Sequence, residues 1–99
     1  MRRLNVLAVC GMGLGTGLLL RMQAEKALNQ LGVLADLEVA DIGSARALAP
    51  SADVVITSAE LAMQLGDVNA AVVTITNFVD VVEIRDKLAV ALGHLEARQ

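Results

Sequence analysis

Apolar residues along this chain fall into two kinds of pattern. Short continuous aliphatic runs, such as Leu4-Asn5-Val6-Leu7-Ala8-Val9, end at turn residues and are typical of buried strands. Between these runs, apolar residues recur every three to four positions, as on one face of a helix. The predicted strands are residues 4–9, 35–42, 53–57 and 71–75. The predicted helical segments are residues 17–31, 43–49 (a short helix or turn), 60–65 and 80–96.

The two long helices have clear inner faces and end signals. Glycine at position 32 follows the first long helix, where a helix C-terminus often takes a left-handed residue. Asp80 precedes the last helix as a predicted N-cap. The predicted inner face of the first long helix consists of Leu20, Ala24, Ala27, Leu28 and Leu31. That of the last helix consists of Val81, Ile84, Leu88, Ala91, Leu92 and Leu95.

Strands that alternate with helices predict an α/β fold. The expected architecture is a three-layer α/β/α sandwich with a four-stranded parallel sheet and helices on both faces. Right-handed crossovers limit the topology, and we expect the strand order 2-1-3-4. This order puts a switch point beside the first strand, where ligands bind at the carboxyl ends of strands. The 99 residues, with no linker or repeat, predict a single domain covering residues 1–99.

Composition excludes several classes of function. A net charge of −3 and a single aromatic residue, Phe78, argue against nucleic-acid binding, which needs a basic face and stacking side chains. One cysteine and one histidine provide neither a disulfide nor a zinc site, so no metal or cofactor is expected. A reduced thiol indicates a cytoplasmic protein. The apolar stretch near the N-terminus is too short before Cys10 for a signal peptide, and too rich in glycine for a membrane span.

One segment carries chemistry: the glycine-rich connection between the first strand and the first long helix. Successive N–H groups of such a loop can converge on an anion, and glycines leave room for it. The helix that follows adds its unpaired N–H groups and the positive end of its dipole. We therefore predict a phosphate-binding loop (P-loop) after the first strand. Its residues are Gly11, Met12, Gly13, Leu14, Gly15, Thr16 and Gly17.

Cys10 stands at the start of this loop and is the predicted nucleophile. The positive field of the loop is expected to lower the pKa of the thiol and favour the thiolate. A nucleophilic thiolate beside a phosphate cradle predicts a phosphocysteine intermediate. The Thr16 hydroxyl is placed either to bond the thiolate or a phosphoryl oxygen, or to cap the helix. Met12 and Leu14 are candidates for a docking rim or for inward packing. Arg21 could reach toward the phosphate, but it is one turn into the helix and is interpreted as an ordinary solvated arginine.

Known phosphate-binding motifs fit this loop poorly. The dinucleotide fingerprint G-x-G-x-x-G fails because position 16 is Thr16, and the Walker loop fails because no lysine follows the glycines. The spacing Cys-x5-Thr is that of the Cys-x5-Arg loop of tyrosine phosphatases, with Thr16 in place of the arginine. Without that guanidinium fork, transfer to a partner is favoured over transfer to water. The roles of Thr76, Asn77 and His94 stay open.

The loop resembles that of the IIB components of the phosphoenolpyruvate-dependent sugar phosphotransferase system (PTS), especially the galactitol/ascorbate type. The family pattern is Cys-Gly-x-Gly-x-Gly-Ser-Ser. Its cysteine and three glycines match here, and the two serines are replaced by Thr16 and Gly17. Residues 52–58 and 72–77 also resemble the third and fourth strands of the family, whose lactose/cellobiose-type fold agrees with the predicted order of elements.

The resemblance implies a phosphocarrier. Cys10 would accept a phosphoryl group from a phosphohistidine on a IIA protein and donate it to a sugar or polyol held by the membrane transporter IIC. It implies a cytoplasmic protein that reaches the inner membrane only through IIC. The sugar cannot be read from the sequence. Two alternatives remain: a small tyrosine-phosphatase-like hydrolase, and a non-catalytic anion- or redox-sensing domain, although a redox switch usually needs a second cysteine.

Overall fold

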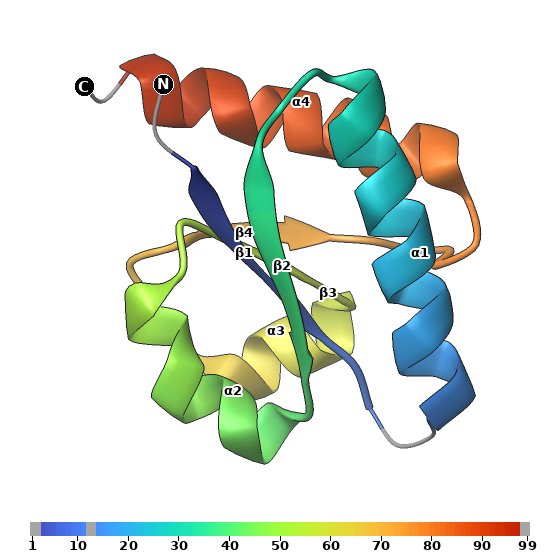
Figure 1. Cartoon of the computed structure of the whole chain (residues 1–99). Helices are drawn as coiled ribbons and strands as arrows, with labels where there is room; N and C mark the ends of the chain where they lie inside the picture. The colour runs from blue at the N-terminus through green and yellow to red at the C-terminus, as the bar shows by residue number, and fades with distance from the viewer. Residues whose placement is uncertain (1–2, 12–13, 98–99) are drawn as a thin grey trace.

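The sheet has the predicted composition and order. The computed structural model describes residues 3–11 and 14–97, with side chains described for 3–11 and 17–93. In the described residues, four parallel strands form one sheet in the order β2-β1-β3-β4 (Figure 1). The strands are β1 (Leu4–Val9), β2 (Ala35–Ala40), β3 (Val54–Thr57) and β4 (Ala71–Thr74).

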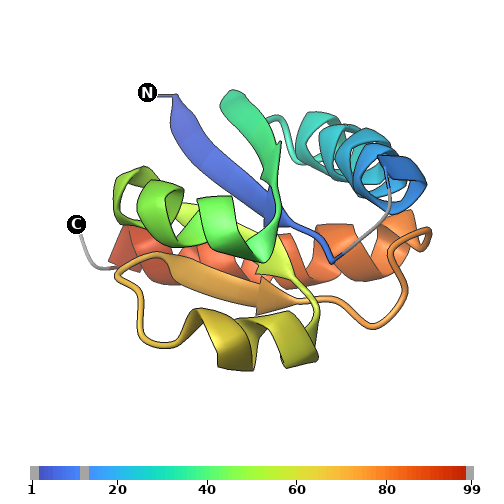
Figure 2. The same cartoon turned by 90° about the horizontal axis from the view of Figure 1, so that it is seen from below.

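Helices cover both faces of this sheet, as the predicted three-layer architecture requires. They are α1 (Leu14–Gln30), α2 (Ile42–Leu48), α3 (Ala59–Leu65) and α4 (Val81–Ala97), with a short 3₁₀ turn, η1 (Ala49–Ser51), after α2. Figure 2 shows α2 and α3 on the near side of the sheet and α4 behind it. None of the helices in the described part of the chain is long and apolar enough to cross a membrane.

Each face of the sheet has its own core, because successive strand residues point to opposite sides. Along β1 and the residue that follows it, Val6, Ala8 and Cys10 face α1 and α4, whereas Leu7 and Val9 face α2 and α3. All five residues are at most 3% exposed. A strand that is buried on both faces has a continuous run of apolar residues. This run is what made β1 recognisable in the sequence.

The first helix begins earlier than predicted. It starts at Leu14 rather than at Gly17, so the last four residues of the predicted loop lie in the beginning of α1. A glycine in a helix interior is about 1 kcal/mol less favourable than an alanine. This penalty is the reason why the helix was predicted to start later. Gly17 is buried, and even an added Cβ would lie only 3.3 Å from Val39 Cγ1 of β2, so close packing outweighs this preference. The predicted second strand is also too long at its end: β2 stops at Ala40 because Asp41 caps α2, accepting a 2.7 Å bond from the Ser44 N–H.

Other helix ends follow the predicted signals. Gly32, after α1, has a φ of +70°, the left-handed conformation expected at that position. Gly66 ends α3 with a φ of +76°. The Asp80 carboxylate accepts from the N–H groups of Val82 and Glu83, which confirms Asp80 as the cap of α4.

A carboxylate on α4 fastens the connection between β4 and this helix. Glu83 accepts from Lys87 Nζ at 2.6 Å and from the N–H groups of Thr76 and Asn77 at 2.8 and 2.9 Å. Lys87 also donates to the Thr74 carbonyl at 2.8 Å. These bonds lower the pKa of Glu83 from its usual 4.5 to about 2, and the bond from Lys87 makes the largest contribution.

We predict that Glu83→Gln destabilises the protein in a pH-dependent way. The folded pKa of Glu83 lies below the unfolded one, so the carboxylate contributes its full stabilisation above about pH 4.5 and loses it as the pH falls toward about 2. Thermal unfolding of wild type and variant between pH 7 and pH 2.5 measures this. The melting temperature of the variant should lie below that of wild type at pH 7, and the gap should narrow as the pH falls. A gap that stays constant would contradict this role.

Candidate functional site

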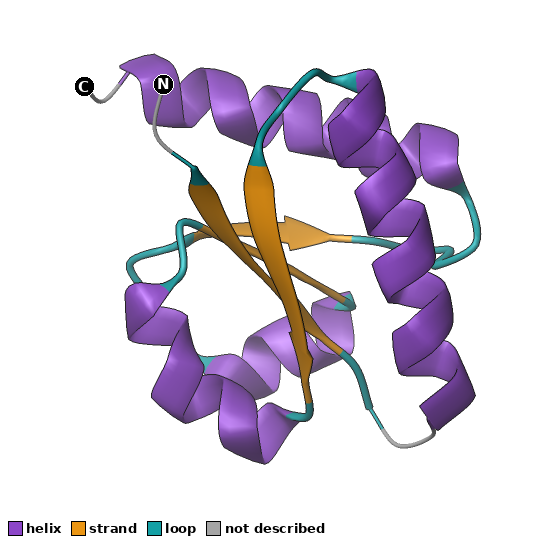
Figure 3. Ribbon diagram, viewed as in Figure 1, coloured by secondary structure: helices purple, strands orange, loops and turns teal. Residues whose placement is uncertain are grey.

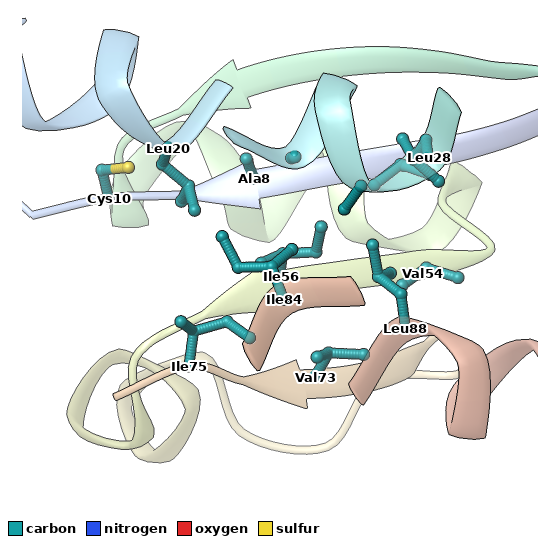
Figure 4. Packing of buried hydrophobic residues seen from close by; sticks show 13 residues of the cluster. Ala8, Cys10, Leu20, Leu28, Val54, Ile56, Val73, Ile75, Ile84 and Leu88 are labelled. Carbon is teal, nitrogen blue, oxygen red and sulfur yellow. The ribbon is translucent and has the colours of Figure 1, made fainter. Parts of the chain in front are cut away.

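Cys10 lies at the carboxyl end of β1, beneath α1. Its N–H donates to the Ala40 carbonyl at 3.1 Å, which extends the pairing with β2 by one residue. Its side chain is 3% exposed and joins the apolar cluster between the sheet and α1. Figure 4 shows the sulfur turned toward Leu20 of α1. The predicted nucleophile is thus held at the strand end that the topology favours for ligand binding.

A buried hydroxyl on the neighbouring strand fixes this strand end. Thr57, the last residue of β3, is fully buried and donates through Oγ1 to the Val9 carbonyl at 2.9 Å. A buried hydroxyl without an acceptor is costly, so this bond holds the residue immediately before Cys10. Sequence reasoning did not select Thr57 as a site residue. The available signal was a hydroxyl that ends an otherwise aliphatic strand, Val-Val-Ile-Thr.

The pKa of Cys10 moves in the direction opposite to the prediction. Burial raises the pKa of the Cys10 thiol above its ordinary value, because the apolar surroundings disfavour the charged thiolate. The prediction of a lowered pKa considered the loop and the helix dipole. It did not consider the core side chains that pack around the sulfur. The apolar surroundings in this structure therefore favour the neutral thiol over the thiolate.

An open cavity of about 990 Å³ adjoins Cys10. Its walls come from three places: the end of β1 with the start of α1, the β2–α2 connection, and α3. Figure 3 shows β1 leading toward α1 next to the end of β2. Most of the described lining is apolar, with Arg21 from α1 and Asp41 from the β2–α2 connection as its charged side chains. The cavity lies at the carboxyl ends of β1 and β2, beside the predicted switch point.

The structure describes the predicted loop only in part. Cys10, Gly11 and Gly17 all line the cavity. Met12 and Gly13 lie outside the described residues. Leu14, Gly15 and Thr16 form the first turn of α1, where backbone N–H groups have no partner within the helix, but their side chains are outside the description. The proposed roles of the Thr16 hydroxyl and of the two rim side chains therefore stay predictions.

Three further candidates differ in outcome. The N–H groups of Thr76 and Asn77 donate to Glu83, and neither residue lines the described cavity beside Cys10. The side chain of His94 lies outside the described residues. Among the described residues, no group of three or more His, Cys, Asp and Glu side chains could hold a metal ion.

Gly17 lets α1 pass close to the sulfur. A Cβ at this position would lie 3.3 Å from Val39 Cγ1 and 3.9 Å from Cys10 Sγ. The first distance is tighter than ordinary van der Waals contact, so Val39 would have to move by a few tenths of an ångström. The missing side chain thus keeps space beside the thiol.

We predict that Gly17→Ala narrows access to Cys10. Gly93→Ala is the matched control, because Gly93 also lies in a long helix but an added Cβ meets nothing within 4 Å. The control should gain up to about 1 kcal/mol in free energy of unfolding from better helix propensity. Gly17→Ala should gain less or lose stability, and its Cys10 should react more slowly with iodoacetamide. Urea unfolding measures the change in stability, and the rate of alkylation measures access to the thiol. Equal gains in stability for the two variants, with an unchanged alkylation rate, would contradict the idea that a Cβ at position 17 crowds Val39 and Cys10.

Comparison with known proteins places the chain in a family. The sequence profile described as "PTS system, Lactose/Cellobiose specific IIB subunit" matches residues 5–90. The "Ascorbate-specific PTS system EIIB component" of Mycoplasma pneumoniae (strain ATCC 29342 / M129 / Subtype 1) is 32% identical over 92 residues, which cover 92% of this chain and 97% of that protein.

A solved structure shares the fold. The lactose-specific IIB component domain of the phosphoenolpyruvate:carbohydrate phosphotransferase system from Streptococcus pneumoniae superposes with a TM-score of 0.58 at 18% identity, covering 94% of this chain and 98% of that one. At this identity the likeness concerns the fold alone. The profile match and the 32% identical relative go further and confirm the resemblance seen in the loop: the chain belongs to the lactose/cellobiose-specific IIB subunit family of the sugar phosphotransferase system.

Proposed function

We propose that this IIB protein carries a phosphoryl group on Cys10, between a IIA protein and a sugar held by the transporter IIC. The observation that carries the proposal is the position of Cys10: it lines an open cavity at the carboxyl end of β1, four residues before the first turn of α1. A thiol in this place can receive a phosphoryl group while the N-terminus of α1 faces the phosphoryl oxygens.

In the first step, Cys10 Sγ attacks the phosphorus of a phosphohistidine on IIA. The S–P bond forms, the N–P bond breaks, and the thiol proton passes to the departing imidazole nitrogen. A raised pKa fits this exchange, because a neutral thiol still carries the proton that the imidazole takes up. The nucleophile becomes anionic only as the proton leaves.

In the second step, a hydroxyl of the sugar or polyol attacks the same phosphorus. The O–P bond forms, the S–P bond breaks, and the hydroxyl proton returns to the sulfur. The burial that disfavours the thiolate favours this return to the thiol. Cys10 thereby ends each cycle in its resting protonation state.

Main-chain N–H groups are proposed to hold the phosphoryl group between the two steps. The residues that would supply them are Gly11, Met12, Gly13, Leu14, Gly15, Thr16 and Gly17, together with the Thr16 hydroxyl. The phosphoryl oxygens would project into the cavity, so the dianion would avoid the apolar surroundings that penalise a bare thiolate. Such fixed donors stabilise charge without reorganisation during transfer.

Membership of the IIB family supports the proposed partners and location. We place the protein in the cytoplasm, at the membrane only through IIC, with no nucleic acid, metal or cofactor. The relative from Mycoplasma is described as ascorbate-specific, so ascorbate is the first substrate to assay. Specificity for the sugar would lie mainly in IIC, because the proposed role of this chain is to handle the phosphoryl group alone.

The proposal is tested by incubating the chain with phosphoenolpyruvate, the general phosphotransfer proteins and a IIA protein. Intact-mass spectrometry should show the gain of one phosphoryl group that depends on IIA. The same preparation should not hydrolyse p-nitrophenyl phosphate above background. Rapid hydrolysis without phosphorylation by IIA would instead favour the phosphatase-like alternative.

A further inference from the structure

The cavity beside Cys10 has one cation among its described lining residues, Arg21. The other charged residue there, Asp41, is already engaged as the cap of α2, and its bond from the Ser44 N–H holds the pKa of its carboxyl below the usual value. Asp41 therefore stays anionic and cannot attract a phosphoryl dianion. Any positive side-chain charge in the described part of this cavity comes from Arg21.

Arg21 lies one helical turn from the part of α1 that passes the thiol, and Arg21 and Cys10 line the same cavity. Arg21 lies four residues after Gly17, so the two share one face of α1. In the structure the Arg21 Nε bonds Glu25, one turn toward the C-terminus of α1. A change of rotamer toward the N-terminus, the direction in which helical side chains lean, would carry the guanidinium over the turn that contains Gly17. An added Cβ on Gly17 would lie 3.9 Å from Cys10 Sγ. The absence of a side chain at Gly17 removes one obstacle between this guanidinium and a group attached to the sulfur.

The present partner of Arg21 is weak and exchangeable. Its Nε donates to Glu25 at 3.0 Å, with both side chains about half exposed, at 53% and 52%. Exposed pairs of this kind contribute little because water and salt compete for them. No described residue accepts from the two Nη groups of Arg21. A dianion on Cys10 would thus offer this guanidinium a stronger partner than Glu25 does.

We propose that Arg21 binds the phosphoryl group on Cys10, exchanging its contact with Glu25 for one with the phosphoryl oxygens. This inference rests on the proposed phosphocarrier function and adds a side chain to it that the loop motif does not contain. The guanidinium lies outside the glycine loop but inside the same cavity. It supplies part of the charge that a phosphatase-type arginine supplies from the position of Thr16.

The test compares three variants in the phosphorylation assay with IIA. Arg21→Gln removes the cation, Arg21→Lys keeps the charge without the fork, and Lys26→Gln removes an exposed cation of α1 outside the described cavity lining. The readout is the fraction of the chain phosphorylated at equilibrium with IIA, by intact mass. Arg21→Gln should lower the equilibrium constant about three- to tenfold, the loss of one charge-assisted contact in a half-exposed site. Arg21→Lys should restore part of the lost equilibrium constant, and the equilibrium constant of Lys26→Gln should equal that of wild type.

A fourth variant tests the exchange itself. Glu25→Gln frees Arg21 from its competitor and should raise the phosphorylated fraction, an effect that a merely structural role of Arg21 would not produce. Urea unfolding of all variants controls for folding. Equal phosphorylation of Arg21→Gln and Lys26→Gln would overturn the role of Arg21 and leave the phosphocarrier function standing. Wild type that takes no phosphoryl group from IIA would overturn both.

Discussion

Cys10→Ser is expected to abolish transfer of the phosphoryl group to this chain. A serine hydroxyl is a far weaker nucleophile than a thiol, and the side chain at position 10 lies in an apolar cluster that disfavours its ionised form. The rate of phosphorylation by IIA should fall by more than about 10³-fold, as for loss of a nucleophile elsewhere. Intact-mass spectrometry over a time course measures it.

Loss of labelling must be separated from loss of the fold. The serine hydroxyl would be buried without an assured partner, which costs about 1–3 kcal/mol. Cys10→Ala avoids that penalty and should be equally inactive while unfolding at a urea concentration closer to wild type. A serine variant that gains a phosphate as fast as wild type would remove Cys10 from the role of acceptor.

Leu20→Ala is expected to have the largest effect on stability among the changes considered. Leu20 is fully buried where α1 packs over β1, and Figure 4 shows it next to Cys10. Truncating such a side chain leaves a cavity and should cost about 3 kcal/mol in free energy of unfolding. Small domains have only about 5–15 kcal/mol in total, so this loss is large.

Leu18→Ala is the matched control for this substitution. Leu18 is on the same helix but is 60% exposed, and its truncation should change stability by no more than about 0.5 kcal/mol. Urea unfolding of both variants gives the comparison. Equal losses would mean that α1 does not pack against the sheet through the face that contains Leu20.

The sequence contained most of the fold because its two central strands, β1 and β3, are largely buried on both faces. Apolar runs such as the one ending at Val9 are long enough to locate without structural data, and the switch point beside β1 followed from topology rules. The start of α1 could not be located in this way. Helix propensity argues against a helix that includes Gly15 and Gly17. The reason for the helix is seen only in the structure, where Gly17 lets α1 approach Val39 of β2 closely.

The sequence predicted where Cys10 lies in the fold, but not its electrostatic surroundings. Cys10 follows the end of β1 as expected, since that position depends on local sequence, while its role as the acceptor stays a proposal. The direction of its pKa shift was wrong, because the residues that bury the sulfur come from elements distant in the chain. Thr57 was missed for the same reason: its bond to the Val9 carbonyl joins residues 48 positions apart.

Mapping the phosphoryl group to a residue tests the central claim most directly. The phosphorylated chain would be digested under conditions that preserve phosphocysteine, and the peptides analysed by mass spectrometry. The account predicts one phosphate, on the peptide containing Cys10, and protection of that thiol from iodoacetamide until the phosphoryl group is passed on. A phosphate on His94 or any other residue, with Cys10 still open to alkylation, would contradict it.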